Sequence, residues 1–184
     1  MLLTRKAHLI VVQYLDAGDL AVDATAGNGH DSLFLAQQVG EKGRVFAFDI
    51  QEQALHATAA RLEQAGLAAR VELIHGGHEH MAESLPADSQ GRIRAVMFNL
   101  GYLPHSDKAT ITRSEHTLPA LEQARRLLAP DGVISVLAYR GHPGGLEESL
   151  AVKEALTDLA GGLKLSILES PGPVLMALAP QAHE

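Results

Sequence analysis

Short apolar runs alternate along the chain with longer segments in which apolar residues recur every three or four positions. Short runs bounded by Gly, Pro or Asp are typical of buried strands, and the longer pattern is typical of helices with one packed face. The predicted strands are residues 20–23, 44–49, 71–75, 93–99, 133–138, 164–169 and 174–179. The predicted helices are residues 4–15, 30–39, 52–65, 78–85, 114–128 and 145–159.

This order of elements predicts an α/β fold. Strands that alternate with helices form right-handed β-α-β units, so we expect a doubly wound, mainly parallel, seven-stranded sheet. Ser170-Pro-Gly-Pro173 joins the last two strands as a hairpin, which adds one antiparallel strand. We expect helix 4–15 on one edge of the sheet, Ser114 as a helix N-cap, and Ala129-Pro-Asp-Gly132 as a turn.

Length and composition narrow the possible classes. The 184 residues fit one domain over residues 1–184, and 46% apolar residues allow a sizeable core. Because the chain has no Cys, disulfides, thiolate metal sites and Cys nucleophiles are excluded. No stretch approaches ~18 uninterrupted apolar residues, so we expect no membrane span and a cytoplasmic protein. A net charge of −7 argues against a broad nucleic-acid groove.

A glycine-containing segment after the first strand has the features of a ligand loop. A doubly wound sheet binds its ligand beyond the carboxyl ends of its strands. Asp23 ends the first strand, and Gly27 and Gly29 allow a tight turn and a close backbone approach to a ligand. The next helix begins near His30, so its N-terminal amides face that ligand. Asp49, at the end of the second strand, is placed to accept hydrogen bonds from two ribose hydroxyls.

Two cofactors compete for this loop. Gly27-x-Gly29-x-x-Ser32 is a partial match to the dinucleotide motif. Asp23 favours S-adenosylmethionine (SAM) instead, because the methionine ammonium needs an anionic neighbour and a pyrophosphate would be repelled. We therefore predict SAM as the cofactor. The predicted cofactor-binding residues are Asp23, Thr25, Gly27, Asn28, Gly29, His30, Asp31, Asp49, Gln51, Gly77, His78 and Asn99.

The segment His75-Gly-Gly-His-Glu-His80 follows the third strand and carries three histidines. Spaced histidines are one signature of zinc, but Glu79 is the only nearby carboxylate and no Cys helps. We favour polar residues that line the cofactor pocket, and we expect no metal.

Two further loops supply a candidate acceptor site. The fourth strand ends in Phe98-Asn-Leu-Gly-Tyr-Leu-Pro104, which is similar to the Asn-Pro-Pro-Tyr loop of nitrogen methyltransferases. There the Asn99 oxygen would orient an amine and Tyr102 would stack on a planar base. After the fifth strand, His142 is either a catalytic base or an exposed residue of a helix-entry turn.

Three segments together resemble one known family. Asp23-Ala-Thr-Ala-Gly-Asn-Gly-His-Asp31, Asn99-Leu-Gly-Tyr-Leu-Pro104 and Tyr139-x-Gly-His-Pro-x-Gly145 occur in this order in the bacterial family labelled rRNA methylase. Members of that family act as tRNA 5-aminomethyl-2-thiouridine methyltransferases. The resemblance runs from Ala7-His8 to the helix at Glu147.

The resemblance implies a class I methyltransferase fold and SAM-dependent methylation of the aminomethyl nitrogen at tRNA wobble position 34. It implies the anticodon stem-loop of tRNA as partner and Asn99, Tyr102 and His142 as the acceptor-site set. We expect a monomer or a homodimer. Two alternatives stay open: a methyltransferase of rRNA or of a small amine, and an NAD-type or non-catalytic nucleotide-binding protein.

Overall fold

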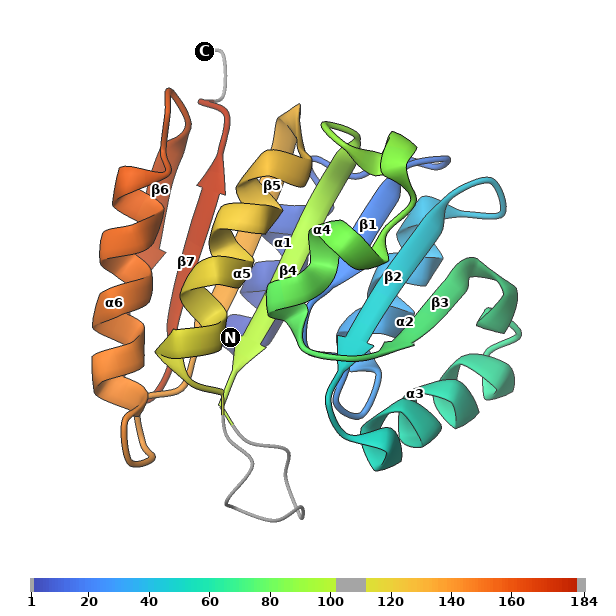
Figure 1. The fold of residues 1–184 in the computed structure, drawn as a ribbon, viewed down its shortest axis with the longest axis horizontal. Helices are drawn as coiled ribbons and strands as arrows, with labels where there is room; N and C mark the ends of the chain where they lie inside the picture. The colour runs from blue at the N-terminus through green and yellow to red at the C-terminus, as the bar shows by residue number, and fades with distance from the viewer. Residues whose placement is uncertain (1, 102–111, 182–184) are drawn as a thin grey trace.

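The computed structural model describes residues 2–101 and 112–181. In these residues a seven-stranded sheet lies between two layers of helices (Figure 1). The strands are β1 (Leu20–Asp23), β2 (Arg44–Asp49), β3 (Val71–His75), β4 (Ile93–Leu100), β5 (Leu128–Ala138), β6 (Lys164–Leu168) and β7 (Val174–Ala179). The α-helices are α1 (Leu3–Val11), α2 (His30–Val39), α3 (Glu52–Gln64), α4 (Met81–Ser84), α5 (Ser114–Leu127) and α6 (Gly145–Asp158). Short 3-10 helices are η1 (Ala68–Arg70), η2 (His78–His80) and η3 (Ala87–Ser89).

The sheet has the strand order β3-β2-β1-β4-β5-β7-β6. Strands β1 to β5 pair in parallel, whereas β7 is antiparallel to both β5 and β6. The predicted mainly parallel sheet with one antiparallel strand is therefore confirmed. The hairpin at residues 170–173 reverses the chain and allows β7 to insert between β5 and β6.

Alternate residues of each strand serve two separate cores, because side chains of a strand point to opposite faces. In β1, Ala21 packs with α1 and α2, whereas Val22 packs with α4, α5 and α6. Phe46, Phe48 and Phe98 are the largest fully buried side chains and belong to the second core. Each such burial contributes about 1.5–3 kcal/mol. Both faces are thus covered, which explains why the central strands are mostly apolar.

The position of α1 and the start of α5 differ from the sequence predictions. Helix α1 lies against β5 and β7, so it covers a face of the sheet and not its edge as predicted. It buries Leu3, Ala7 and Val11 there. Ser114 is the first residue of α5 and not its N-cap. The N-cap position is Arg113, which makes no side-chain capping bond.

The predicted turn at residues 129–132 is wrong, because this segment is an irregular part of β5. Ile93 pairs with Leu128 and Ala95 with Val133, so extra residues bulge from the edge of the ladder between them. Asp131 pairs with Arg94 of β4, and the Arg94 hydrogen bond lowers the pKa of the Asp131 carboxyl. Gly132 passes so close to β4 that an added Cβ would lie 2.9 Å from the Arg94 carbonyl oxygen. These contacts between strands outweigh the local turn composition.

The strand order reverses between β1 and β4, which lie side by side. Their carboxyl ends, with that of β2, point to the lower edge of the molecule in Figure 1. Ligands of open α/β sheets bind at such a reversal. In the described part of the chain, no helix is long and apolar enough to cross a membrane.

Candidate functional site

A cavity of about 670 Å³ opens at this reversal of strand order. One wall is formed by the segments that follow β1, β2 and β3, and the other by the end of β4, the start of α5 and Tyr139. Its size falls in the usual range of small-molecule sites. The cavity therefore joins the two loops that the sequence assigned separately to cofactor and acceptor.

Asp49 ties the glycine loop to β2. Its Oδ2 accepts a hydrogen bond of 2.9 Å from the Gly27 amide, and its Oδ1 accepts one of 2.9 Å from the Gln51 amide. A carboxylate oxygen can accept more than one hydrogen bond, so each keeps capacity for a ligand hydroxyl. Because Asp49 also lines the cavity, it fits the predicted ribose-binding role.

Asp23 does not reach the cavity surface. It is fully buried, and its two oxygens accept hydrogen bonds from the Thr25 amide (3.1 Å) and the Ser32 hydroxyl (2.6 Å). Burial, with repulsion from Asp31, raises the pKa of the Asp23 carboxyl to about 7. Asp23 thus fixes the loop from beneath, and the expected direct contact with a ligand ammonium is not seen in this geometry.

Gly29 also lies behind the cavity wall. It is the left-handed N-cap of α2, with φ of 76°, and an added Cβ would lie 2.9 Å from Cα of Thr58 on α3. Its glycine is required for the turn and for the contact between α2 and α3. All other predicted cofactor residues line the cavity: Thr25, Gly27, Asn28, His30, Asp31, Asp49, Gln51, Gly77, His78 and Asn99.

The three histidines after β3 have three different partners. His75 Nε2 lies 3.0 Å from the Ile50 carbonyl oxygen, and His78 Nδ1 lies 2.9 Å from that of Ala24. His80 lies 3.9 Å from Glu83. Burial lowers the pKa of the His78 imidazole, so its ring is held neutral at the cavity wall. Across residues 2–101 and 112–181, no three His, Asp or Glu side chains gather as a metal site.

Asn99 joins the acceptor wall to the cofactor loop. Its backbone amide donates a 2.8 Å hydrogen bond to Oγ1 of Thr25. Two residues on, the Gly101 carbonyl accepts a 3.0 Å hydrogen bond from the Thr112 amide. The Thr112 hydroxyl donates to Oε2 of the buried Glu148 at 2.9 Å. The chain on both sides of residues 102–111 is therefore fixed beside Asn99, whereas Tyr102 lies outside the described residues.

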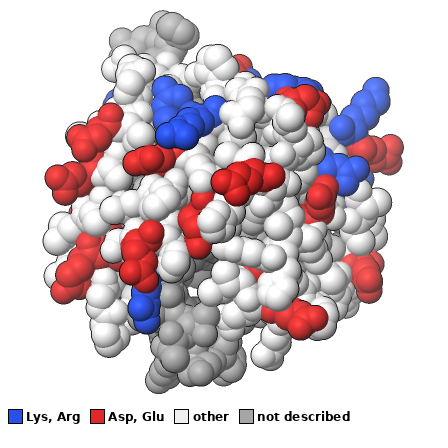
Figure 2. All heavy atoms as spheres, viewed as in Figure 1, with Lys and Arg blue, Asp and Glu red and all other residues white. Residues whose placement is uncertain are grey.

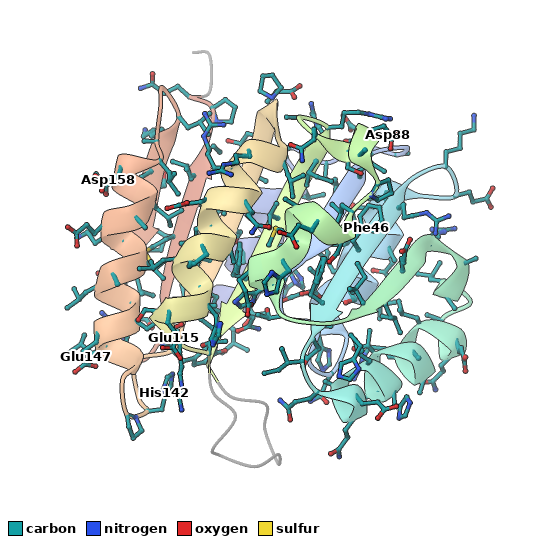
Figure 3. The ribbon with its side chains drawn as sticks, viewed as in Figure 1. Phe46, Asp88, Glu115, His142, Glu147 and Asp158 are labelled. Atoms are coloured by element: carbon teal, nitrogen blue, oxygen red, sulfur yellow. The ribbon has the colours of Figure 1, made fainter. Side chains whose placement is uncertain are left out.

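His142 is not part of the described cavity wall. It lies in the turn before α6, on the same side of the molecule as Glu147 (Figure 3). Its ring packs so closely on Gly145 that a Cβ there would lie 2.8 Å from Nε2 of His142. Among the described residues, the cavity wall therefore includes Asn99 and does not include His142.

Two residues of the cavity wall form an ion pair that the sequence did not predict. Nδ1 of His116, in the first turn of α5, lies 2.9 Å from Oε1 of Glu79 in η2. Although burial opposes ionisation, the backbone hydrogen bond and His116 hold the pKa of Glu79 below its usual range. Gln123 donates to the Glu79 carbonyl as well. No local sequence pattern connects Glu79 with His116, because the two residues are far apart in the chain. The only signal in the sequence was the position of His116 in the first turn of a predicted helix, close to the end of a strand.

The described residues fit SAM. Asp49 is oriented to accept from a diol, Gly76 has open space where a side chain would otherwise lie, and the apolar Ile50 is exposed at the cavity. The first turn of α2 brings its free amides to the same wall.

Comparison with known proteins supports this assignment. Residues 45–167 match the model of the family described as putative rRNA methylase. A member from Clostridium thermocellum superposes with a TM-score of 0.90 at 38% identity, over 96% of both chains. A methyltransferase from Streptococcus mutans, solved in complex with SAH, superposes with a TM-score of 0.84 at 32% identity, also over 96% of both chains.

A curated relative is the chloroplastic tRNA (mnm5s2U34)-methyltransferase of Arabidopsis thaliana. It is 44% identical over 160 residues, which are 83% of this chain and 57% of that protein. The chain thus spans little more than half the length of that relative. The matches confirm the predicted family and fold. By sequence and by fold, this chain belongs to the putative rRNA methylase family of class I SAM-dependent methyltransferases.

Proposed function

We propose that this chain transfers the methyl group of SAM to the aminomethyl nitrogen of 5-aminomethyl-2-thiouridine at tRNA wobble position 34. The observation that carries the proposal is one cavity that contains both the Asp49 loop and Asn99. The name of the Arabidopsis relative supports the tRNA substrate. The match of the Asn99, Tyr102 and His142 segments to the family supports an amine acceptor.

The residues of one wall hold the cofactor. Asp49 accepts the ribose hydroxyls, and Gly77 and Ile50 flank the adenine. SAM, when bound, supplies an activated methyl group on a positively charged sulfur. The loop over residues 24–28 places its backbone against this ligand, because Gly27 (φ 53°) gives it a turn that other residues rarely adopt.

The residues of the other wall orient the amine. A primary alkyl amine is mostly protonated at neutral pH, and only the neutral form attacks. The side-chain oxygen of Asn99 accepts a hydrogen bond from the nitrogen and directs its lone pair to the methyl carbon. Alignment of this kind makes the larger contribution to the rate, and a proton acceptor beside the amine adds to it.

The charge distribution favours recognition of a single nucleotide over a broad RNA surface. On the face shown in Figure 2, acidic side chains are scattered over α5 and α6, and basic ones lie mostly toward the upper edge. Arg113 is the one Lys or Arg among the described residues that line the cavity. It is placed to contact a phosphate beside the target base, which a single-stranded anticodon loop can present unstacked.

The decisive experiment is methyl transfer to defined tRNA. Purified protein with SAM is incubated with tRNA that carries 5-aminomethyl-2-thiouridine, and the nucleosides are analysed by mass spectrometry. We expect a mass gain of one methyl group on this nucleoside and none on tRNA with unmodified uridine at position 34. Absence of transfer there, together with transfer to rRNA or to a small amine, would refute the proposed substrate. Calorimetry with SAM and NAD tests the cofactor separately.

A further inference from the structure

A histidine from the first helix contacts the cofactor wall. Nε2 of His8 lies 2.6 Å from Oδ1 of Asp31, in the first turn of α2. The His8 ring stacks on Phe34, with ring centres 3.9 Å apart and planes 2° from parallel. Phe34 is one helical turn from Asp31, so α2 supplies both the partner and the platform for this imidazole. The position and orientation of His8 are therefore fixed by α2 itself.

Three carboxylates line the cavity among the described residues: Asp31, Asp49 and Glu79. The oxygens of Asp49 bind the Gly27 and Gln51 amides, and Glu79 pairs with His116. Asp31 binds His8 through Oδ1, and no described residue donates a hydrogen bond to its Oδ2. It is only 6% exposed, yet it lies on the cavity wall beside the glycine loop.

A carboxylate that is mostly withdrawn from water, with one oxygen available at a cavity wall, strongly favours a cation that reaches it. The neighbouring Asp23 carboxyl makes a cation beside Asp31 still more favourable. The negative charge of Asp31 is one cause of the raised pKa of Asp23, so the two carboxylates repel each other. A positive charge placed against Asp31 offsets that repulsion as well.

We propose that Asp31 receives the α-ammonium group at the methionine end of SAM, and that His8 is the positioning residue that holds Asp31 for this contact. The inference rests on the proposed cofactor and does not depend on the acceptor. The inference gives α1 a second role. This helix packs against β5 and β7 and buries Leu3, Ala7 and Val11, and through His8 it also holds Asp31 at the cavity wall.

The test uses three ligands that differ only at the methionine end. S-adenosylhomocysteine has the ammonium and the carboxylate, its deaminated analogue has the carboxylate alone, and 5′-methylthioadenosine has neither. Affinities are measured by calorimetry for the wild type, Asp31→Asn, His8→Ala and His8→Gln. His56→Ala is the control, because His56 is an exposed histidine of α3. The affinity for 5′-methylthioadenosine also reports whether each variant retains a folded pocket.

We expect Asp31→Asn to weaken S-adenosylhomocysteine binding about tenfold or more, since a charge-assisted hydrogen bond is lost. Binding of the two ligands without the ammonium should stay unchanged. His8→Ala should show a smaller loss with the same ligand selectivity. His8→Gln should restore most of the affinity, because the glutamine amide reaches a similar position and donates.

Equal losses for all three ligands would overturn the inference, since they would show only a structural role for His8 and Asp31. Unchanged S-adenosylhomocysteine affinity in Asp31→Asn would also overturn it. Failure of the tRNA assay with this binding pattern intact would refute the acceptor alone. If the wild type bound none of the three adenosine ligands, the assignment of SAM as cofactor and the proposed Asp31 contact would both be refuted.

Discussion

The backbone amide of Gly27 donates a 2.9 Å hydrogen bond to Oδ2 of Asp49, and this bond joins the turn after β1 to the carboxyl end of β2. The second oxygen of the same carboxylate is held by the Gln51 amide. The carboxylate is therefore oriented before a ligand arrives. Binding then costs less conformational entropy than with a mobile side chain.

The first prediction concerns this carboxylate. Asp49→Asn keeps the shape but replaces one acceptor by an amide donor, which faces the donating amide of Gly27 or Gln51. We expect SAM affinity to fall about tenfold or more, as measured by calorimetry. Asp158→Asn is the matched control, because this exposed aspartate lies at the opposite end of the molecule from the strand ends (Figure 3). Wild-type affinity in a folded Asp49→Asn protein would contradict the ribose assignment.

A second prediction separates the acceptor wall from the cofactor wall. Asn99→Ala removes the side-chain oxygen but keeps the backbone hydrogen bond to Thr25. We expect kcat for tRNA methylation to fall roughly 10- to 100-fold because alignment of the amine is lost, with little change in SAM affinity. Gln64→Ala, an exposed amide at the end of α3, should leave both quantities unchanged. A lost SAM affinity with unchanged kcat would move Asn99 to the cofactor site.

The third prediction concerns the cavity-lining cation. Arg113 is exposed and has only a loose ion pair of 3.7 Å with Glu115. If it contacts one phosphate, Arg113→Ala should raise KM for tRNA, leave kcat nearly unchanged and lower the salt slope of binding by about one. Arg126→Ala, an exposed cation later in α5, is the control. An equal effect of both substitutions would point to general charge attraction.

The fourth prediction tests the packing of α2 on α3. Gly29→Ala forces a side chain into the left-handed region and against Cα of Thr58, so we expect a loss of about 1–3 kcal/mol in the free energy of unfolding. Gly172→Ala places its Cβ in open space and should change stability by less than about 0.5 kcal/mol. Urea denaturation of both variants measures the difference. A Gly29→Ala protein as stable as Gly172→Ala would show that α3 moves away easily.

The fifth prediction is a pH dependence. The pKa of Asp23 is raised from 3.8 to about 7 in the folded protein, so between these values the native state holds a proton that the unfolded state has released. Its contribution to stability is therefore lost as pH rises from about 4 to about 7. Asp23→Asn removes this loss, and the variant should gain stability relative to wild type between pH 5 and pH 8. Denaturation midpoints at both pH values check this, and a constant difference would contradict it.

Much of the site was predictable because its signals are local. Asp49 and the Gly27 loop follow buried strands, and carboxyl ends of parallel strands meet at one edge of a sheet. The predicted strands therefore placed the cavity correctly, together with most of the residues predicted to bind the cofactor.

The predictions that the structure corrects depend on contacts between segments that are distant in the sequence. Whether Asp23 or Asp31 faces the cavity is decided by Ser32 beneath the loop and by His8 on another helix. The segment at residues 129–132 has the composition of a turn, but in the structure Asp131 pairs with Arg94 and Gly132 passes close to β4. No pattern within a short stretch of sequence contains these relationships.

The hydrogen bond between the Gly101 carbonyl and the Thr112 amide has an evolutionary consequence. Because the two ends of the intervening segment are joined to each other, and Thr112 is also anchored to Glu148, changes in length between them need not displace Asn99 or Arg113. The two anchors at Gly101 and Thr112 therefore let the acceptor side and the cofactor side of the cavity change independently of one another.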